Sequence, residues 1–239
     1  MVKRHLWLVI SKKRLFLPLA AALLGALLWA CGSKLLLWGG GLKGDPLSVL
    51  EGGLEKTKAS ASFRYRSCTV LLPAKENEGF YSRVEGEWAA PDRVHIKGEI
   101  LGAPVEFVQV GNCSYIKDHV TGKWITLRGS TPADSELFYA ELNPKAFFNF
   151  KGIPAVEYRG VQVVNGERLH AFEFVPNPMD PFLEARFSEL KYRVWLVPPD
   201  FVLRKALITA AERNRPQRGV EIELYFWDYD QNLKIEPPV

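Results

Sequence analysis

Residues 156–175 read VEYRGVQVVNGERLHAFEFV, and this stretch decides the fold class of the chain. Two strand-forming runs, 156–164 and 167–175, flank the dipeptide Asn165-Gly166. An Asn-Gly pair between such runs is the strongest short-range signal for a β-hairpin with a two-residue turn. The stretch therefore predicts two adjacent antiparallel strands.

Alternation of side chains at a period of two extends this prediction over most of the chain. Residues 63–71 show it clearly, and Pro, Gly, Asn or Asp separates the runs from one another. Such alternation indicates a sheet with one covered face and one face in water. We expect about ten or eleven strands. The other strand-like runs are 79–89, 94–100, 105–110, 114–117, 123–127, 192–197, 201–209 and 220–228.

Two stretches break this period and indicate helices. Asp45-Pro46 has the form of an N-cap followed by proline in the first turn, and Leu50 and Leu54 follow at helical spacing. One or two short helices are expected between 131 and 150, interrupted at Asn143-Pro144. The predicted fold class is α+β, mostly β. A single large antiparallel sheet curls into an incomplete barrel, because so many strands cannot stay flat, and two or three helices cap it.

The first 44 residues have the pattern of a membrane-targeting segment. Basic residues in 1–14 precede an uncharged apolar run of 19 residues, 15–33. As a helix this run spans about 28 Å, close to the thickness of the bilayer hydrocarbon. The basic flank predicts a cytoplasmic N-terminus. The chain then divides into a cytoplasmic flank (1–14), a transmembrane signal anchor or lipoprotein signal (15–38), a linker (39–45) and one exported domain (46–239).

The end of the apolar run resembles a bacterial lipobox, Leu28-Trp29-Ala30-Cys31-Gly32-Ser33, in which the cysteine is lipidated. Leu28 and Ala30 fit that pattern, whereas Trp29 does not, and the apolar run resumes at 35–38. Three outcomes stay open: lipid on Cys31, an uncleaved signal anchor, or release after cleavage. The first two place the domain on the outer face of a bacterial cytoplasmic membrane, tethered to it.

The basic charge of the chain is confined to this N-terminal segment. Seven of the 31 Lys and Arg residues precede Asp45, the first acidic residue. The remainder carries 24 basic and 27 acidic residues, a net charge of −3. A mildly acidic domain without a basic stripe does not suit nucleic-acid binding, which we exclude.

Residue patterns for catalysis are missing from the sequence. The four histidines stand apart without metal-ligand spacing, and no nucleophile elbow or phosphate loop occurs. We therefore expect no catalytic residue, no metal and no cofactor, and hence no enzyme. Cys68 and Cys113 are expected to be isolated thiols, because sequence does not show whether the two are within bridging distance. Export permits a disulfide between them as the alternative.

Aromatic side chains on the expected strands are the best lead to function. They are ordinary core material, but one set of them could also line a cavity of the size of an acyl chain. The candidates for such a lining are Phe63, Tyr65, Phe107, Phe172, Phe174, Trp195 and Phe226.

Several local motifs together resemble a known family. Tyr158-Arg159-Gly160 followed by Val164-Asn165-Gly166-Glu167 resembles a recurring hairpin of the LolA-like superfamily, which includes LppX/LprG-type lipoproteins and the N-terminal domain of RseB. The resemblance implies a curled, incomplete barrel whose interior holds acyl chains, without catalytic residues. The other matching stretches are 143–150, Tyr192-Arg193-Val194-Trp195-Leu196 with Leu203-Arg204-Lys205, and 225–238.

Two functional hypotheses follow. The leading one is a membrane-tethered extracytoplasmic domain that holds a hydrophobic ligand, either a lipid or the acyl chain of a lipoprotein, inside the curled sheet. The alternative is a regulatory, sensor or structural domain of the cell envelope that binds a protein partner and has no ligand cavity. In the alternative, a solid core and an exposed apolar patch or free sheet edge are expected.

Overall fold

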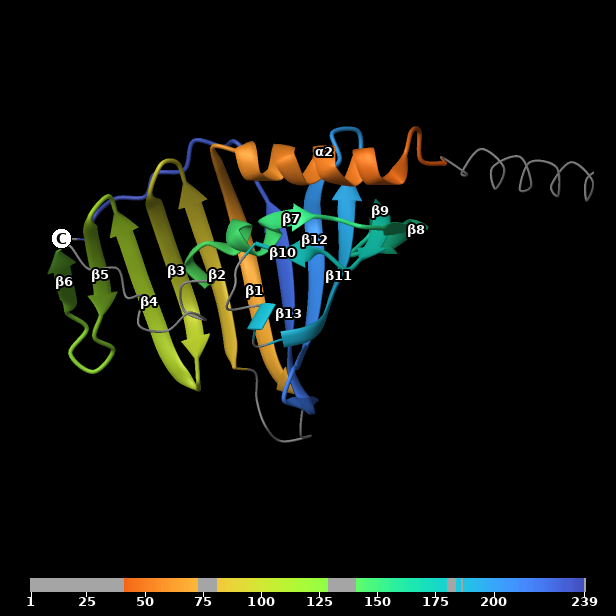
Figure 1. Ribbon diagram of the computed structural model, residues 1–239. Helices are drawn as coiled ribbons and strands as arrows, with labels where there is room; N and C mark the ends of the chain where they lie inside the picture. The colour runs from red at the N-terminus through yellow and green to blue at the C-terminus, as the bar shows by residue number, and fades with distance from the viewer. Residues whose placement is uncertain (1–40, 73–80, 129–140, 180–183, 186, 239) are drawn as a thin grey trace, which may run out of the picture. The chain divides into compact units, whose positions relative to one another are not determined.

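An antiparallel sheet of 11 strands forms the body of this computed structural model (Figure 1). The strands lie in the order β6-β5-β4-β3-β2-β1-β13-β12-β11-β9-β8. Their bounds are β1 (Ser62–Leu72), β2 (Ser82–Ala89), β3 (Arg93–Ile100), β4 (Ala103–Val110), β5 (Cys113–Lys117), β6 (Trp124–Arg128), β8 (Val156–Val164), β9 (Glu167–Phe174), β11 (Phe187–Val197), β12 (Val202–Glu212) and β13 (Arg215–Trp227).

The structure describes residues 41–72, 81–128, 141–179, 184–185 and 187–238. Within them the first and last strands of the sheet, β1 and β13, pair at its centre, from Arg64 opposite Trp227 to Leu72 opposite Gly219. The strands on either side then follow chain order outward to the edge strands β6 and β8, which do not pair with each other. The prediction of one large curled antiparallel sheet is confirmed, and the described sheet is not a closed barrel.

The hairpin that the sequence predicted at Asn165-Gly166 joins β8 to β9. Val164 lies opposite Glu167, so two residues form the turn. Asn165 and Gly166 have φ angles of 51° and 83°. Positive φ at both central positions is the signature of the tight turn that matches the twist of a hairpin.

Helix α2 (Pro46–Ala59) covers one face of the sheet at the ends of β11 and β12 (Figure 1). Asp45 caps its N-terminus as predicted, accepting a hydrogen bond from the Ser48 backbone N–H at 2.9 Å. Gly53 faces the turn between β11 and β12, where any Cβ would collide with the Phe201 carbonyl oxygen. Next to it, the Thr57 hydroxyl accepts a hydrogen bond from the Leu203 backbone N–H at 2.9 Å. A small residue and a hydroxyl therefore fix the helix against the sheet.

We call the face that carries α2 the inner face and the opposite one the outer face. The inner face is also covered by the 3₁₀ helix η2 (Pro144–Phe148) and by a two-stranded sheet of β7 (Phe150–Gly152) and β10 (Asn177–Pro178). The sequence predicted two or three capping helices and no second sheet. In the described part of the chain α2 and η2 lie over this face, and residues 141–142 are helical as well. Residues 131–140 of the predicted helical stretch lie outside the described part.

The predicted N-terminal membrane helix falls on residues that the structure does not describe. The described helices include none that is long and apolar enough to cross a membrane. The expected membrane segment, 15–38, and Cys31 within it precede residue 41 and lie outside the described residues.

Candidate functional site

The inner face brings together six of the seven aromatic residues that the sequence analysis proposed as the lining of a cavity. Because successive side chains on a strand point to opposite faces, these residues share one side of β1, β4, β9 and β13. None is more than 4% exposed, and all belong to one apolar cluster with Leu50 and Leu54 of α2. The six are Phe63, Tyr65, Phe107, Phe172, Phe174 and Phe226.

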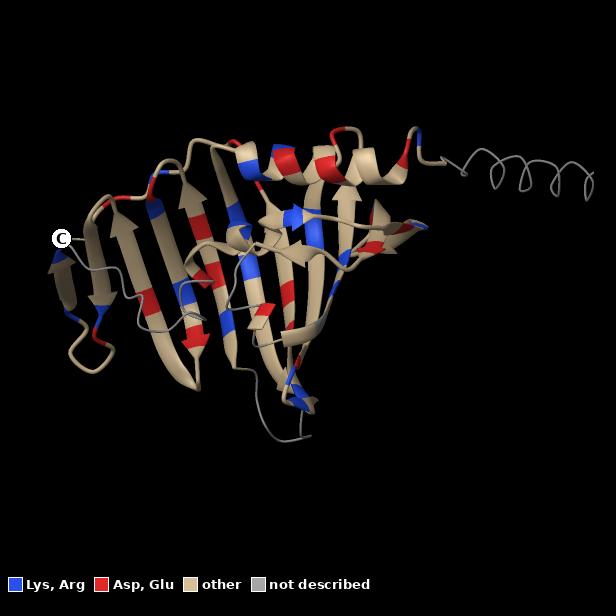
Figure 2. Ribbon diagram, viewed as in Figure 1, with Lys and Arg blue, Asp and Glu red and all other residues tan. Residues whose placement is uncertain are grey.

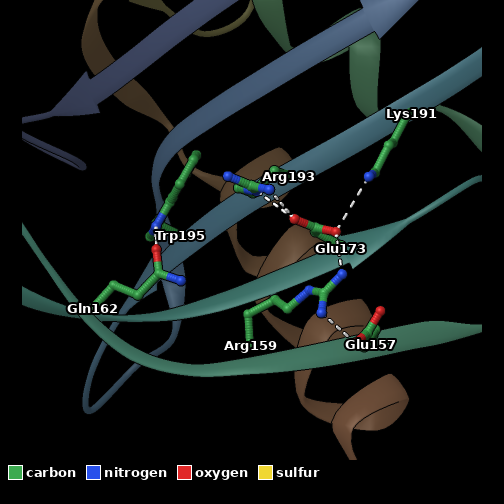
Figure 3. Close-up of polar contacts among 7 residues, drawn as sticks. All are labelled: Glu157, Arg159, Gln162, Glu173, Lys191, Arg193 and Trp195. Atoms are coloured by element: carbon green, nitrogen blue, oxygen red, sulfur yellow. Dashed lines mark hydrogen bonds and ion pairs between the residues drawn. The ribbon is translucent and has the colours of Figure 1, made fainter.

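Trp195 is the member of the nominated set that lies elsewhere. Val194 and Leu196, its neighbours on β11, face inward, so Trp195 points to the outer face. There it packs with Leu169 and Ala171, and its indole N–H donates a hydrogen bond to Gln162 Oε1 at 2.8 Å (Figure 3). The alternation in Tyr192, Val194 and Leu196 is the sequence signal that could have excluded it.

Residues 141–152, which we call the cover, fill the inner face against these aromatic rings. Phe148 is 1% exposed, with its ring centroid 6.2 Å from Phe226 and 6.1 Å from Tyr192. Phe150 stands edge-on to Tyr192 at 5.1 Å. Sequence reasoning missed these rings as part of the site, although the cluster Phe147, Phe148 and Phe150 is visible in the sequence.

The cover is fastened mainly by side chains that bind backbone carbonyl groups. The Tyr192 hydroxyl donates to the Phe147 carbonyl at 2.8 Å, and the Tyr65 hydroxyl donates to the Glu141 carbonyl at 2.6 Å. Lys145 Nζ donates to the Lys58 carbonyl at 2.9 Å, at the end of α2. Burial raises the pKa of Tyr192, so its hydroxyl stays protonated and able to donate.

Lys145 occupies an unusual position between the cover and the sheet. Its Nζ lies 3.5 Å from the centroid of the Trp88 ring and 5.3 Å from that of Phe63, an arrangement that favours a cation over an aromatic face. Burial lowers its pKa to about 8, and the negative charge of Asp230 opposes this only in part. The amine therefore links the cover to the end of α2, and its charge changes near pH 8.

A polar cluster interrupts the apolar inner face at the far end of β1 and β2. Glu141 is 4% exposed, and its Oε1 accepts hydrogen bonds from Ser82 Oγ at 2.5 Å and Thr69 Oγ1 at 3.0 Å. Its Oε2 and the Ser67 hydroxyl are buried and have no hydrogen-bond partner among the described residues. Burial, together with the charge of Glu141, raises the pKa of Tyr65 well above its usual value. Sequence reasoning did not identify this cluster.

The outer face carries ion pairs that run from strand to strand, and Figure 2 shows charged residues spaced along the strands. Its most buried charge is Glu173, 4% exposed, which contacts Arg159, Lys191 and Arg193 (Figure 3). Burial alone would raise the pKa of Glu173, but hydrogen bonds from these three cations outweigh it and lower the pKa to about 2. This carboxylate is fully compensated.

The two cysteines are free, as in the expectation of isolated thiols, and the possible disulfide between them does not form. Cys68 lies on β1 and Cys113 on β5, with β2, β3 and β4 between them. Neighbouring strands are about 4.8 Å apart, so four steps separate the thiols by roughly 19 Å, far beyond bridging distance. In the described part of the chain no group of three or more His, Cys, Asp or Glu residues could hold a metal ion.

A hollow of about 220 Å³ opens at the far ends of β12 and β13, beside Leu72, Ala211 and Arg218. Sites for small molecules usually measure about 300–1,000 Å³ and have mostly apolar walls. The hollow also lies away from the aromatic rings that we describe above. The inner face, rather than this hollow, is therefore the candidate site.

The comparisons with known proteins are consistent with this geometry. The chain matches no protein-family model, and no curated protein matches it. The solved lipoprotein LppX of Mycobacterium tuberculosis is similar with a TM-score of 0.53 and 15% identity, over 81% of this chain and 100% of LppX. LprF of Mycobacterium bovis is similar with a TM-score of 0.55 and 14% identity, over 80% of this chain and 96% of LprF.

A LolA superfamily protein of Nitrosomonas europaea is similar with a TM-score of 0.35 and 12% identity, over 78% of this chain and 94% of that protein. Only the TM-scores for LppX and LprF are high enough to assign the fold. Sequence identities this low support a shared fold and no shared function. The unit Leu42–Val239 therefore shares the fold of LppX and LprF.

Proposed function

We propose that this domain binds a hydrophobic ligand, either a lipid or the acyl chain of a lipoprotein, on the inner face of its curled sheet, outside the cytoplasm and tethered to the membrane. The observation that carries the proposal is the contrast between the inner face and what covers it. The face is a continuous aromatic surface, whereas the cover is a short segment with one 3₁₀ turn and three residues of strand.

Exchange of the Phe148 and Phe150 rings of the cover for an acyl chain is energetically reasonable. Burying one phenylalanine side chain contributes roughly 1.5–3 kcal/mol, and burying one methylene group contributes about 0.8 kcal/mol. Two to four methylene groups therefore offset the loss of one ring such as that of Phe148. Burial of a dozen or more methylene groups on the sheet would contribute more free energy than the loss of the Phe148 and Phe150 rings costs.

Two observations support the proposed membrane tether, one from the N-terminal sequence and one from a structural relative. Cys31 stands in a lipobox-like context, and the solved LppX is a lipoprotein. Either a lipid on Cys31 or an uncleaved helix at 15–38 would hold the inner face close to a bilayer that contains acyl chains. A ligand taken from that bilayer would not have to cross water over a long distance.

Uptake of a fluorescent fatty acid by the full chain in lipid nanodiscs tests this proposal. Phe147 lies on the cover and packs against the aromatic cluster, so Phe147→Ala should loosen the cover and increase uptake several-fold. Trp227 lies on the outer face of β13, and Trp227→Ala is the matched control that should leave uptake unchanged. No uptake above that of empty nanodiscs, in the wild type or in Phe147→Ala, would contradict the proposal.

A second candidate function is recognition of a protein partner without a ligand cavity. The observation in its favour is that Tyr65, Phe148, Phe172 and Phe226 are each no more than 1% exposed, so side chains fill the described interior. Apolar residues on the two edge strands of the described sheet, Ile125 on β6 and Val163 on β8, are 52% and 70% exposed. This function would be favoured if the protein takes up no fluorescent fatty acid and a protein partner binds along one of these edge strands.

A further inference from the structure

The polar cluster on the inner face consists of Tyr65, Ser67, Thr69, Ser82 and Glu141. Thr69 lies directly opposite Ser82, and two positions along the same face Ser67 lies opposite Val84. Glu141 reaches across these rows: Tyr65 holds its carbonyl group, and Thr69 and Ser82 hold its carboxylate. Ser67 lies on β1 between the two residues that contact Glu141, so its hydroxyl belongs to the same small region.

Hydrogen bonding in this cluster is incomplete. From the described residues Glu141 Oε1 accepts two hydrogen bonds, while Oε2 is buried and accepts none. The Ser67 hydroxyl oxygen is likewise buried and has no partner among these residues. Most buried polar atoms in native proteins have a partner, so two unpaired ones on the same face of the sheet call for an explanation. A group that donates hydrogen bonds to both atoms would complete the cluster.

The charge of Glu141 is also uncompensated among the described residues. Its partners are neutral hydroxyl groups, and none of the ion pairs of the described residues involves it. An ionised carboxylate without a cationic partner is costly to bury. Glu173 on the outer face differs in this respect, because three cations neutralise its carboxylate.

From these observations we infer that Glu141 and Ser67 bind the protonated amine of an amine-bearing amphiphile whose apolar part lies on the aromatic inner face. An ammonium group supplies both the positive charge that Glu141 lacks and several N–H donors, enough for Oε2 and the Ser67 hydroxyl together. The apolar surface begins beside the cluster, since the ring of Tyr65 lies 5.8 Å from that of Phe63. This inference rests on the proposed function and specifies the polar end of its ligand.

Binding of three amphiphiles with the same chain length tests the inference, with dodecylamine, dodecanol and dodecanoate as probes. Each is titrated below its micelle concentration against the full chain in nanodiscs, and the signal of empty nanodiscs is subtracted. The wild type should bind dodecylamine at least about tenfold more tightly than either of the others, as expected for a buried charge-assisted hydrogen bond. Glu141→Gln should abolish this preference, and Ser67→Ala should reduce it about fivefold.

Glu85→Gln is the matched control, since Glu85 is an exposed acid on the outer face and pairs with Arg66. It should leave the preference for dodecylamine unchanged. Equal binding of all three probes, unaffected by Glu141→Gln or Ser67→Ala, would overturn the inference and leave the proposed function standing. Binding of none of the three would overturn both. The Ser67→Ala variant, a small change, keeps the test valid if Glu141→Gln fails to fold.

Discussion

Two buried carboxylates on opposite faces of one sheet are treated in opposite ways. Glu173 on the outer face contacts Arg159, Lys191 and Arg193. Among the described residues, Glu141 on the inner face has only Thr69 and Ser82 as side-chain partners. Both side chains are about equally buried, so burial does not explain the difference. The outer face is built for stability in water, and the inner face keeps an unsatisfied group where we place the ligand.

The largest expected effect concerns the packing of the cover on the inner face. Phe148→Ala should lower the free energy of unfolding by about 3–5 kcal/mol, because it removes a fully buried ring and leaves a cavity. Urea denaturation of the full chain measures this. A loss below about 1 kcal/mol would show that the cover contributes little to the core and would weaken the contrast between the faces.

The next prediction contrasts the two carboxylates directly. Glu173→Gln should destabilise the protein by about 1–3 kcal/mol, because three half-exposed cations lose their common partner. Glu141→Gln should change stability by less than about 0.5 kcal/mol or increase it, because it removes an uncompensated buried charge. Equal losses in the two variants, measured by urea denaturation, would remove the distinction on which the comparison rests.

Acid titration sharpens the comparison on the outer face. The pKa of Glu173 is about 2 in the folded protein, below the ordinary value of 4.5. The unfolded chain therefore binds the proton first, and the stability that Glu173 contributes is complete above pH 4.5 and is lost as the pH falls towards 2. Unfolding curves between these values should depend on pH less steeply in Glu173→Gln than in the wild type. Parallel curves would contradict this assignment.

Alkaline titration probes the fastening of the cover on the inner face. Lys145 has a pKa of about 8 in the folded protein against 10.5 ordinarily, so between these values the unfolded chain binds more protons than the folded one. Stability due to Lys145 should therefore rise as the pH increases from 8 to 10.5. The difference in unfolding free energy between the wild type and Lys145→Met isolates this rise. If the wild type instead loses stability relative to Lys145→Met over this range, the folded state favours the charged amine.

The smallest effect sets the scale for the others. Glu85 and Arg66 form an exposed pair on the outer face, each about 60% exposed. Glu85→Gln should cost no more than about 1 kcal/mol, because solvent screens the pair. Thermal unfolding at low and high salt measures this cost. A larger loss would indicate that the ion pairs of the outer face act as a cooperative network rather than as separate surface contacts.

The sequence was informative where structure is local. Alternation predicted the strands, Asn165-Gly166 predicted the hairpin of β8 and β9, and Asp45 predicted the start of α2. Pairing of β1 with β13 could not be predicted, because no local signal connects strands so distant in the chain. For the same reason the sequence left open whether Cys68 and Cys113 are bonded, because their separation depends on strand order.

The candidate site was predicted only in part. Six of the aromatic residues proposed to line a cavity lie together on the inner face, because strand periodicity fixes the face that each side chain meets. Their contact with a ligand stays a prediction. Trp195 was misplaced by one position in that period. Glu141 escaped notice because its segment has no period, and its partners Thr69 and Ser82 come from strands far away in the sequence.

Mapping where an acyl chain contacts the protein is the most direct test of the central claim. A photoactivatable fatty acid would be cross-linked to the full chain in native membranes, and the labelled peptides identified by mass spectrometry. The claim predicts labels on the cover, around Phe147–Phe150, and on the inner-face residue Phe226, with none on Trp195 of the outer face. Labels confined to residues 1–40, or spread equally over the outer face, would contradict it.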